Sequence, residues 1–144
     1  LEFATMNRSP RLLHALKLPV RWGEMDALGH VNNAVYLRYF EQSRIEWFDS
    51  LGYRTTGKGS GSILLKAVVT YLKPIVYPCE IEVRMYPAKL GNRSFTLACE
   101  IVNARDAAER FTEGEFVIVW FDYDAQKSVA VPDRLQALLR GEAA

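Results

Sequence analysis

The stretch from Trp22 to Leu51, WGEMDALGHVNNAVYLRYFEQSRIEWFDSL, decides how this chain is expected to fold. Large apolar residues recur in its second half at steps of three and four residues, a spacing that places them on one face of an α-helix. These residues are Tyr36, Tyr39, Phe40, Trp47 and Leu51, with Leu37 and Phe48 beside them. The spacing predicts one long helix over residues 34–51 that buries one face.

The residues at both ends of this segment are typical of helix ends. Asn32 or Asn33 can accept hydrogen bonds from the backbone N–H groups of the first turn, which have no partner inside the helix. Gly52 follows the last turn and is a natural stop. The helix is therefore expected to begin directly after a polar loop and to end at a glycine.

The other side of the helix is mostly polar, with two features that bear on packing. Ile45 falls among the polar residues, which suggests that part of this side is also covered. Arg44 lies at the edge of the apolar stripe, where a charge needs a partner. We expect it to pair with a carboxylate such as that of Glu41.

The loop before the helix, residues 23–33, is rich in residue types that tolerate turns and let the backbone approach a ligand closely. The start of a helix presents free N–H groups and the positive end of the helix dipole, which stabilise a carbonyl oxygen that becomes negative during a reaction. Asp26 lies just upstream of that end. The loop therefore predicts a base or nucleophile facing an oxyanion site, and the alternative role for Asp26 is to cap a turn.

Loop and helix together resemble the signature of the hotdog-fold acyl-CoA thioesterases of the 4-hydroxybenzoyl-CoA thioesterase type. The matching residues are the run DALGHVNNAVY at 26–36, Phe40-Glu41, Arg44 and, downstream, Tyr71-Leu-Lys-Pro74, and the resemblance covers about residues 18–123. It implies an α+β hotdog fold, in which an antiparallel β-sheet wraps around one long central α-helix. It also implies hydrolysis of an acyl-CoA to a free acid and CoA.

The resemblance implies roles for individual residues. Asp26 is expected either to activate water as a general base or to attack the thioester itself, and the sequence leaves both mechanisms open. The backbone N–H of Asn33 is expected to polarise the thioester carbonyl. His30 is expected to shape the loop through hydrogen bonds, with a direct catalytic role as the alternative. The other predicted binding residues of this region are Gly29, Asn32 and Tyr36.

A CoA thioester also carries phosphate groups, which basic side chains on strand ends or loops can bind. The candidates are Lys58, Lys66, Lys73, Arg84, Lys89 and Arg93, none of which stands in a phosphate-loop motif. Of these, Lys66 and Arg93 are the predicted contacts, and a solvated surface charge is the alternative for each. Asp26 and His30 are too few ligands for a zinc site, which needs three or four. We therefore expect no metal. Because the sequence has no redox-cofactor motif and no nucleotide-binding glycine motif, we also expect no cofactor.

Apolar and alternating runs predict five strands. They cover residues 15–22, 62–72, 79–86, 93–102 and 112–123, and a short helix is expected at about 132–140. The run 62–72 and the centre of 112–123 are apolar at nearly every position, which indicates strands covered on both faces. For 112–123 the expected covers are the helix on one side and another subunit on the other. Residues 103–110 are expected to be a connection. One strand, a long helix and four further strands exclude alternating βαβ units and favour an antiparallel sheet around the helix.

Length and composition limit the number of domains, the binding partners and the cellular compartment that can be expected. A chain of 144 residues predicts a single domain over 1–144, with residues 1–5 as a remnant of an expression tag and Met6 as the native start. A net charge of +1 gives no reason to expect binding to nucleic acid or to a membrane. Without a secretion signal, the cytoplasm is the expected compartment, where Cys79 and Cys99 are expected to be reduced. The resemblance implies a homodimer or homotetramer.

Two other functions fit the same residues. A hotdog hydratase or dehydratase needs an acid/base pair, which Asp26 and His30 can supply. A non-catalytic acyl-CoA-binding module binds thioesters and releases no thiol. Substitution of Asp26 separates these possibilities, because only an enzyme has turnover to lose.

Overall fold

The computed structural model describes residues 8–54 and 56–142. These residues form a six-stranded sheet in the order β1-β3-β4-β5-β2, with β6 paired to β5, and every pair is antiparallel. The strands are β1 (His14–Pro19), β2 (Ser60–Tyr71), β3 (Glu80–Leu90), β4 (Ser94–Asn103), β5 (Asp106–Asp122) and β6 (Lys127–Ser128). The helices are η1 (Trp22–Glu24), a short 3-10 helix, α1 (Asn33–Ser50) and α2 (Asp133–Arg140).

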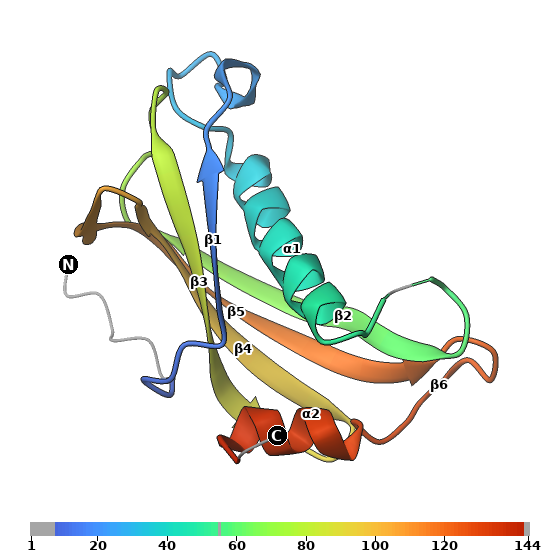
Figure 1. Cartoon of the computed structure of the whole chain (residues 1–144). Coiled ribbons are helices and arrows are strands. Elements are labelled where there is room, and N and C mark those ends of the chain that lie inside the picture. Colours follow the sequence, from blue (N-terminus) through green and yellow to red (C-terminus); the bar gives the residue numbers. More distant parts are fainter. Residues whose placement is uncertain (1–7, 55, 143–144) are drawn as a thin grey trace.

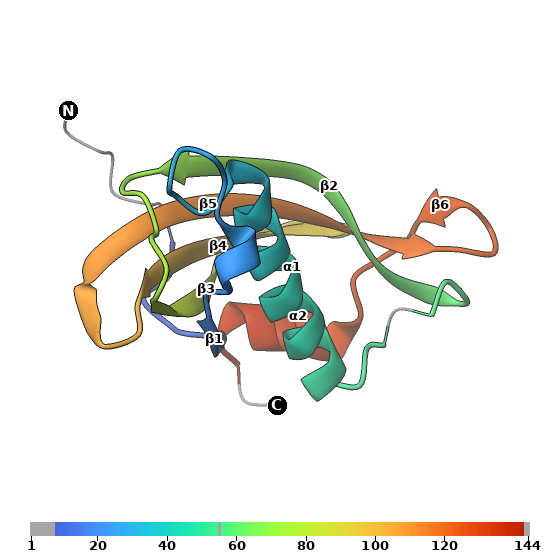
Figure 2. The ribbon, with the colours of Figure 1, turned by 90° about the horizontal axis from the view of Figure 1, so that it is seen from above.

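Helix α1 lies across one face of the curved sheet (Figures 1 and 2). The chain order, the antiparallel pairing and the single long helix make this the α+β hotdog arrangement that was predicted. The predicted single domain over 1–144 stays a prediction, because its ends at 1–7 and 143–144 lie outside the described residues.

The ends of α1 fall where the sequence placed them, to within one residue. The side-chain oxygen of Asn32 accepts a hydrogen bond from the N–H of Ala34 at 2.9 Å, which makes Asn32 the N-cap residue. After the last turn, Gly52 adopts a φ of 85°, a left-handed conformation that a residue with a β-carbon adopts only with strain. Both terminal signals therefore act as predicted, Asn32 at the start of α1 and Gly52 after its end.

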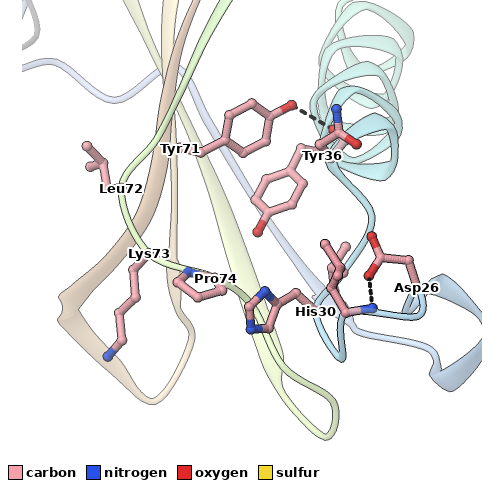
Figure 3. A pocket seen from close by; sticks show the side chains of 10 residues that line it. Asp26, His30, Tyr36, Tyr71, Leu72, Lys73 and Pro74 are labelled. Carbon is pink, nitrogen blue, oxygen red and sulfur yellow. Dashed lines mark hydrogen bonds between the residues drawn. The ribbon is translucent and has the colours of Figure 1, made fainter.

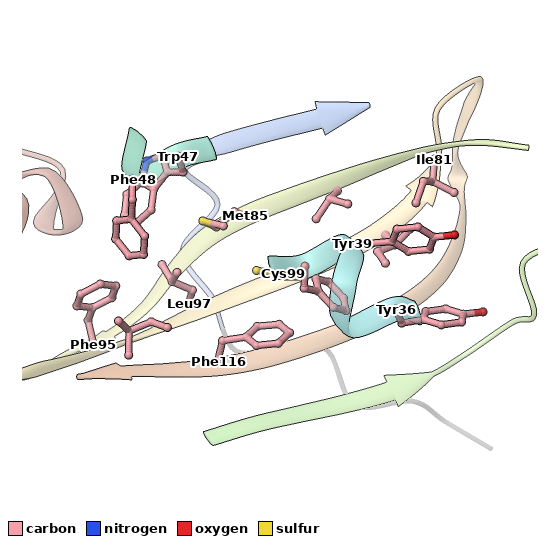
Figure 4. Packing of buried hydrophobic residues seen from close by; sticks show 14 of the residues in the cluster. Tyr36, Tyr39, Trp47, Phe48, Ile81, Met85, Phe95, Leu97, Cys99 and Phe116 are labelled. Carbon is pink, nitrogen blue, oxygen red and sulfur yellow. The ribbon is translucent and has the colours of Figure 1, made fainter. Parts of the chain in front are cut away.

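The core lies between α1 and the sheet and combines aromatic rings with aliphatic side chains (Figure 4). Phe40 has no exposed surface, and its ring centroid lies 4.8 Å from that of Phe116 on β5. Further along the helix, Phe48 lies 6.0 Å from Trp120, edge to face. These offset contacts are the favourable arrangement for aromatic pairs. They hold α1, and with it the loop at its start, in a fixed position over the sheet.

Three strand boundaries differ from the prediction by three or more residues, and one of them is the end of β3, which continues to Leu90 instead of ending at residue 86. The first strand ends at Pro19, because residues 21–25 form a tight turn in which the N–H of Glu24 donates to the carbonyl of Arg21 at 3.0 Å. Strand β5 begins at Asp106, within the predicted connection 103–110. The turn there is short because Asn103 caps it, accepting from the N–H of Arg105 at 2.9 Å.

Strand β2 is an edge strand, which the sequence did not indicate. Its apolar run predicted a strand covered on both faces, but in the described residues only β5 pairs with it. Leu64 is 42% exposed, Leu65 68% and Val68 47%. On β5, residues 116–121 alternate between buried and half-buried. The second face of β5 is therefore only partly covered within the chain. Within the single chain neither β2 nor β5 is covered on both faces, and the cover of β5 by another subunit stays a prediction.

Both cysteines are free thiols. Cys99 is buried on β4, and burial raises its pKa to about 12. Cys79 lies directly before β3 and is half-buried, which also raises its pKa. At neutral pH both groups stay protonated and are poor nucleophiles.

No helix formed by residues 8–54 or 56–142 has the length and apolar character needed to cross a membrane. The helix α2 is instead short, and its residues Leu135 and Leu139 belong to the core.

Arg11 ties the start of the described chain to the C-terminus of α2. Its guanidinium donates to the carbonyls of Leu138 and Leu139 at 2.6 and 2.7 Å. A cation at this end of a helix is favoured by the helix dipole and satisfies carbonyls that have no helical partner.

Replacing Arg11 by alanine is expected to lower the free energy of unfolding by about 1–2 kcal/mol, as both interactions are lost. The free energy of unfolding is measured by urea denaturation. Arg140→Ala is the matched control, because its ion pair with Glu142 and its hydrogen bond to Gln136 are both exposed and are worth little. Equal losses in the two variants would contradict the role given to Arg11.

Candidate active site

A pocket of about 360 Å³ lies at the N-terminus of α1 (Figure 3). It is lined by Asp26, Leu28, His30, Val31, Asn33, Tyr36, Tyr71, Leu72, Lys73 and Pro74. The two segments that carried the resemblance, residues 26–36 and 71–74, thus meet around one cavity. The fold brings them together because β2 ends beside the first turn of α1.

The loop that carries Asp26 is a closed turn with little freedom. The N–H of Asp26 donates to the carbonyl of His30 at 2.9 Å, and the N–H of Gly29 donates back to the carbonyl of Asp26 at 3.0 Å. Gly29 has a φ of 79°, where a β-carbon would be strained. The loop therefore needs a glycine at this position.

Two donors hold the carboxylate of Asp26. The N–H of Leu28 donates to Oδ1 at 2.9 Å, and the side-chain amide of Asn32 donates to Oδ2 at 3.3 Å. The turn-capping role considered from the sequence is thus present in the structure. It is compatible with a chemical role, because the same carboxylate lines the pocket. Capping fixes the direction in which the carboxylate points.

The first backbone N–H groups of α1 differ in whether they have a hydrogen-bond acceptor. Those of Ala34 and Val35 are satisfied by the side-chain and backbone oxygens of Asn32. The N–H of Asn33 has no acceptor within residues 8–54 and 56–142. It lies at the positive end of the helix dipole and beside the pocket, so it is available to an oxygen atom of a bound molecule.

Two tyrosines form the wall opposite the loop. The rings of Tyr36 and Tyr71 meet edge to face with centroids 4.8 Å apart. Tyr71 donates its hydroxyl to the carbonyl of Asn33 at 2.7 Å, while the hydroxyl of Tyr36 accepts from the N–H of Ile75 at 3.2 Å. Burial raises the pKa of both phenols, so both stay protonated at neutral pH. Tyr71 was not singled out from the sequence, although it opens the Tyr71–Pro74 segment of the resemblance.

A third tyrosine, Tyr39, holds the N-terminal end of the loop. Tyr39 donates to the carboxylate of Glu24 at 3.0 Å, and that same oxygen accepts from the N–H of Arg21 at 2.7 Å. The carbonyl of Glu24 in turn accepts from the N–H of Asn32. Burial, followed by the nearby charge of Glu24, raises the pKa of Tyr39. Sequence reasoning missed Glu24 because nothing in its local pattern marks the contact with a helix fifteen residues away.

Of the remaining predicted site residues, only His30 lines the pocket. The carbonyl of His30 holds the loop, but its exposed imidazole has no hydrogen bond in the described part of the chain. Gly29 and Asn32 support the loop from outside the pocket lining. Lys66 lies in the middle of β2, and Arg93 lies before β4, where it donates to the carbonyl of Ser128 at 3.4 Å. Neither basic residue lines the pocket.

Lys73 is the basic residue that does reach the pocket lining. Its ammonium group is bound to Glu109 at 3.0 Å, and this hydrogen bond lowers the pKa of Glu109. Figure 3 shows the Lys73 side chain directed away from the tyrosine rings. The pocket lining therefore combines the carboxylate-bearing Asp26, the imidazole-bearing His30, one free backbone donor and largely apolar walls.

Solved structures with the same fold include proteins named as thioesterases. A Pseudomonas aeruginosa protein named as a candidate thioesterase is 38% identical, with a TM-score of 0.86 over 90% of this chain and 99% of its own. A candidate acyl-CoA thioesterase from Xanthomonas campestris is 30% identical, with a TM-score of 0.75 over 84% of this chain and 100% of its own. A 1,4-dihydroxy-2-naphthoyl-CoA thioesterase from Synechocystis shares the fold at 15% identity, with a TM-score of 0.77 over 88% of this chain and 95% of its own.

The family comparison covers the pocket and most of the described chain. Residues 20–139 match the model of the thioesterase-like superfamily, a range that includes the loop, α1, the five strands β2–β6 and most of α2. The predicted resemblance and the predicted hotdog fold are thereby confirmed. This chain belongs to the thioesterase-like superfamily.

Proposed function

We propose that this protein hydrolyses an acyl-CoA thioester to a free acid and CoA in the pocket at the start of α1. The observation that carries the proposal is that one cavity is lined by Asp26 and by Asn33, whose backbone N–H has no acceptor within residues 8–54 and 56–142. The superfamily supports thioester chemistry, and the 30% identity to the candidate acyl-CoA thioesterase supports CoA as the thiol.

The geometry suggests how the residues divide the reaction. The thioester carbonyl oxygen accepts a hydrogen bond from the N–H of Asn33, which stabilises the negative charge that develops on it. One such donor is worth about 3–4 kcal/mol in the transition state. Asp26 then either removes a proton from the attacking water or attacks the carbonyl carbon itself. In both cases the carbon–sulfur bond breaks and CoA leaves as a thiolate, which takes up a proton. In the second case water hydrolyses the resulting anhydride and regenerates the Asp26 carboxylate. Both mechanisms stay open.

The pocket walls and the basic residues outside the pocket bind different parts of the substrate. Leu28, Val31, Tyr36, Tyr71 and Pro74 offer the acyl group an apolar surface. The predicted phosphate contacts Lys66 and Arg93 lie outside the pocket of one chain, so they serve a CoA whose phosphates extend over the surface or over a second subunit. A homodimer or homotetramer and a cytoplasmic location remain predictions from the sequence.

The proposal is tested by thiol release from a panel of short-chain, long-chain and aromatic acyl-CoAs. A thioesterase releases thiol and free acid in equal amounts, and the preferred substrate defines the acyl class. An acyl-CoA-binding module binds members of the panel without releasing thiol. A hydratase or dehydratase alters the acyl chain and leaves the thioester intact. Either of the last two results overturns the proposal.

Tyr71→Phe is expected to lower kcat roughly 10-fold with little change in KM. The substitution keeps the ring and removes the hydroxyl that holds the carbonyl of Asn33, so the oxyanion donor is less well positioned. Steady-state kinetics on the preferred acyl-CoA measures both constants. Tyr77→Phe is the matched control, because Tyr77 is 43% exposed, close to the 45% of Tyr71, and lies outside the pocket lining. Identical kinetics in the two variants would remove Tyr71 from the site.

A further inference from the structure

Asn32 joins the loop to α1, and all four of its polar groups form hydrogen bonds. Its backbone N–H donates to the carbonyl of Glu24 at 3.0 Å, and its backbone carbonyl accepts from the N–H of Val35 at 2.9 Å. In the side chain, Oδ1 accepts from the N–H of Ala34 at 2.9 Å, while Nδ2 donates to Oδ2 of Asp26 at 3.3 Å. One amide group therefore binds both the first turn of the helix and the carboxylate assigned to catalysis.

The residue type at position 32 meets two requirements at once. Serine, threonine and aspartate also cap helices well, because each has an oxygen that accepts from the first turn. An aspartate would even be favoured by the helix dipole. Asparagine is the one preferred cap residue whose side chain accepts with one atom and donates with another. The chain thus has the cap residue that can hold a second group as well as the helix.

Glu24 and Tyr39 connect Asn32 to the core. Tyr39 on α1 is only 4% exposed, and its hydroxyl donates to Oε1 of Glu24 at 3.0 Å. The same oxygen accepts from the N–H of Arg21 at 2.7 Å, so the Glu24 side chain is held from two sides. The carbonyl of Glu24 in turn accepts from the N–H of Asn32. The position of Asn32 is therefore set by the folded chain and does not depend on a bound substrate.

Capping by Asn32 also sets the place of the oxyanion donor. Asn33 directly follows the cap, and its N–H has no acceptor within residues 8–54 and 56–142. Asp26 and Asn33 both line the pocket, whereas Asn32 lies outside the lining. Asn32 therefore holds both groups from behind the pocket wall.

We propose that Asn32 is a positioning residue that keeps the Asp26 carboxylate at a fixed place relative to the N–H of Asn33. Its Nδ2 limits the rotation of the carboxylate, and its Oδ1 fixes the residue at which α1 begins. The two groups then act on the same thioester carbonyl without having to be brought into place during the reaction. This role rests on the proposed function and runs through Asp26, in place of the contact with the substrate that was expected from the sequence.

Asn32→Ser and Asn32→Asp test this role, because both keep a capping oxygen and both lose the amide donor to Asp26. Asn32→Ser is expected to lower kcat about 10-fold, and Asn32→Asp about 100-fold, since its charge also repels the carboxylate. The dissociation constant of an acyl-CoA analogue that cannot be hydrolysed is expected to change little. An unchanged kcat, or a raised dissociation constant alone, overturns the proposal.

A double variant shows whether Asn32 acts through Asp26. In an Asp26→Asn background, Asn32→Ser is expected to cause no further loss of kcat, because the carboxylate that Asn32 positions is already absent. A residue that contacts the substrate itself would cause the same loss in both backgrounds. Additive losses therefore overturn the proposal.

Asn103→Asp is the matched control. Asn103 makes the same pair of contacts in a turn outside the pocket lining, since its Oδ1 accepts from the N–H of Arg105 at 2.9 Å and its Nδ2 donates to Glu109 at 3.4 Å. Its variant is expected to keep full activity. Equal losses of kcat in Asn103→Asp and Asn32→Asp overturn the proposal. If Asn32→Asp does not fold, as judged by circular dichroism, Asn32→Ser is read alone.

Crystal structures of the wild type and of Asn32→Ser separate the positioning role from the proposed function. We expect α1 to begin at the same residue in both proteins and the Asp26 carboxylate to be rotated in the variant. A carboxylate that keeps its wild-type direction overturns the positioning role, whatever the activity. A rotated carboxylate in a protein whose wild type releases no thiol supports the positioning role and contradicts only the proposed function.

Discussion

Replacing Asp26 by asparagine is expected to lower kcat for thiol release at least about 100-fold, the scale of a lost catalytic base or nucleophile. Asparagine keeps an oxygen that can accept from the N–H of Leu28, so the turn that carries the residue persists. It lacks the negative charge that both mechanisms need. The measurement is kcat on the preferred acyl-CoA, together with binding of an analogue that cannot be hydrolysed, which is expected to change little.

Asp122→Asn is the matched control for this substitution. Asp122 caps a turn in the same way, accepting from the N–H groups of Asp124 and Ala125 at 3.0 and 2.9 Å, but it lies at the far end of β5. Its variant is expected to keep full activity. Retention of more than about a tenth of the wild-type rate by Asp26→Asn would exclude Asp26 from the chemistry.

The largest loss of stability is expected for Phe40→Ala, at about 3–5 kcal/mol. Phe40 is fully buried, and its ring lies against that of Phe116 between α1 and the sheet. Alanine leaves a cavity that the surrounding aromatic rings cannot fill. The free energy of unfolding from urea denaturation, at a fixed protein concentration, measures the loss.

Phe121→Ala shows whether this loss reflects burial or merely the removal of a ring. Phe121 is half-buried near the end of β5, so less apolar surface returns to water when it is truncated. Its loss is expected to be clearly smaller. Equal losses for Phe40→Ala and Phe121→Ala would show that the contact between α1 and the sheet is not the main source of stability.

Local signals predicted the elements that build the site. The period of the apolar residues, the N-cap of Asn32 and the stop at Gly52 each depend on interactions within a few residues, and all three appear in the structure. The loop residue Asp26 and the segment 71–74 were identified separately by resemblance. The structure adds that they face the same pocket.

Interactions between distant segments were not predictable in this way. The apolar run of β2 indicated burial, but a sequence pattern does not say whether the cover comes from the same chain or from another molecule. The hydrogen bonds from Tyr39 to Glu24 and from Tyr71 to Asn33 depend on how α1 lies on the sheet. The predicted pair of Arg44 and Glu41 is wrong, since Glu41 pairs with Arg38 at 3.0 Å, because helical spacing alone does not fix which carboxylate a long side chain reaches.

The most direct test of the proposed site is a crystal structure with an acyl-CoA ketone in which a methylene group replaces the thioester sulfur. This analogue keeps the carbonyl group and cannot be hydrolysed. We expect its carbonyl oxygen to lie about 3 Å from the backbone nitrogen of Asn33, within hydrogen-bonding distance. The Asp26 carboxylate is expected to lie beside the carbonyl carbon. A ketone bound in another cavity, or bound here with its carbonyl directed away from the start of α1, would contradict the assignment of this pocket as the active site.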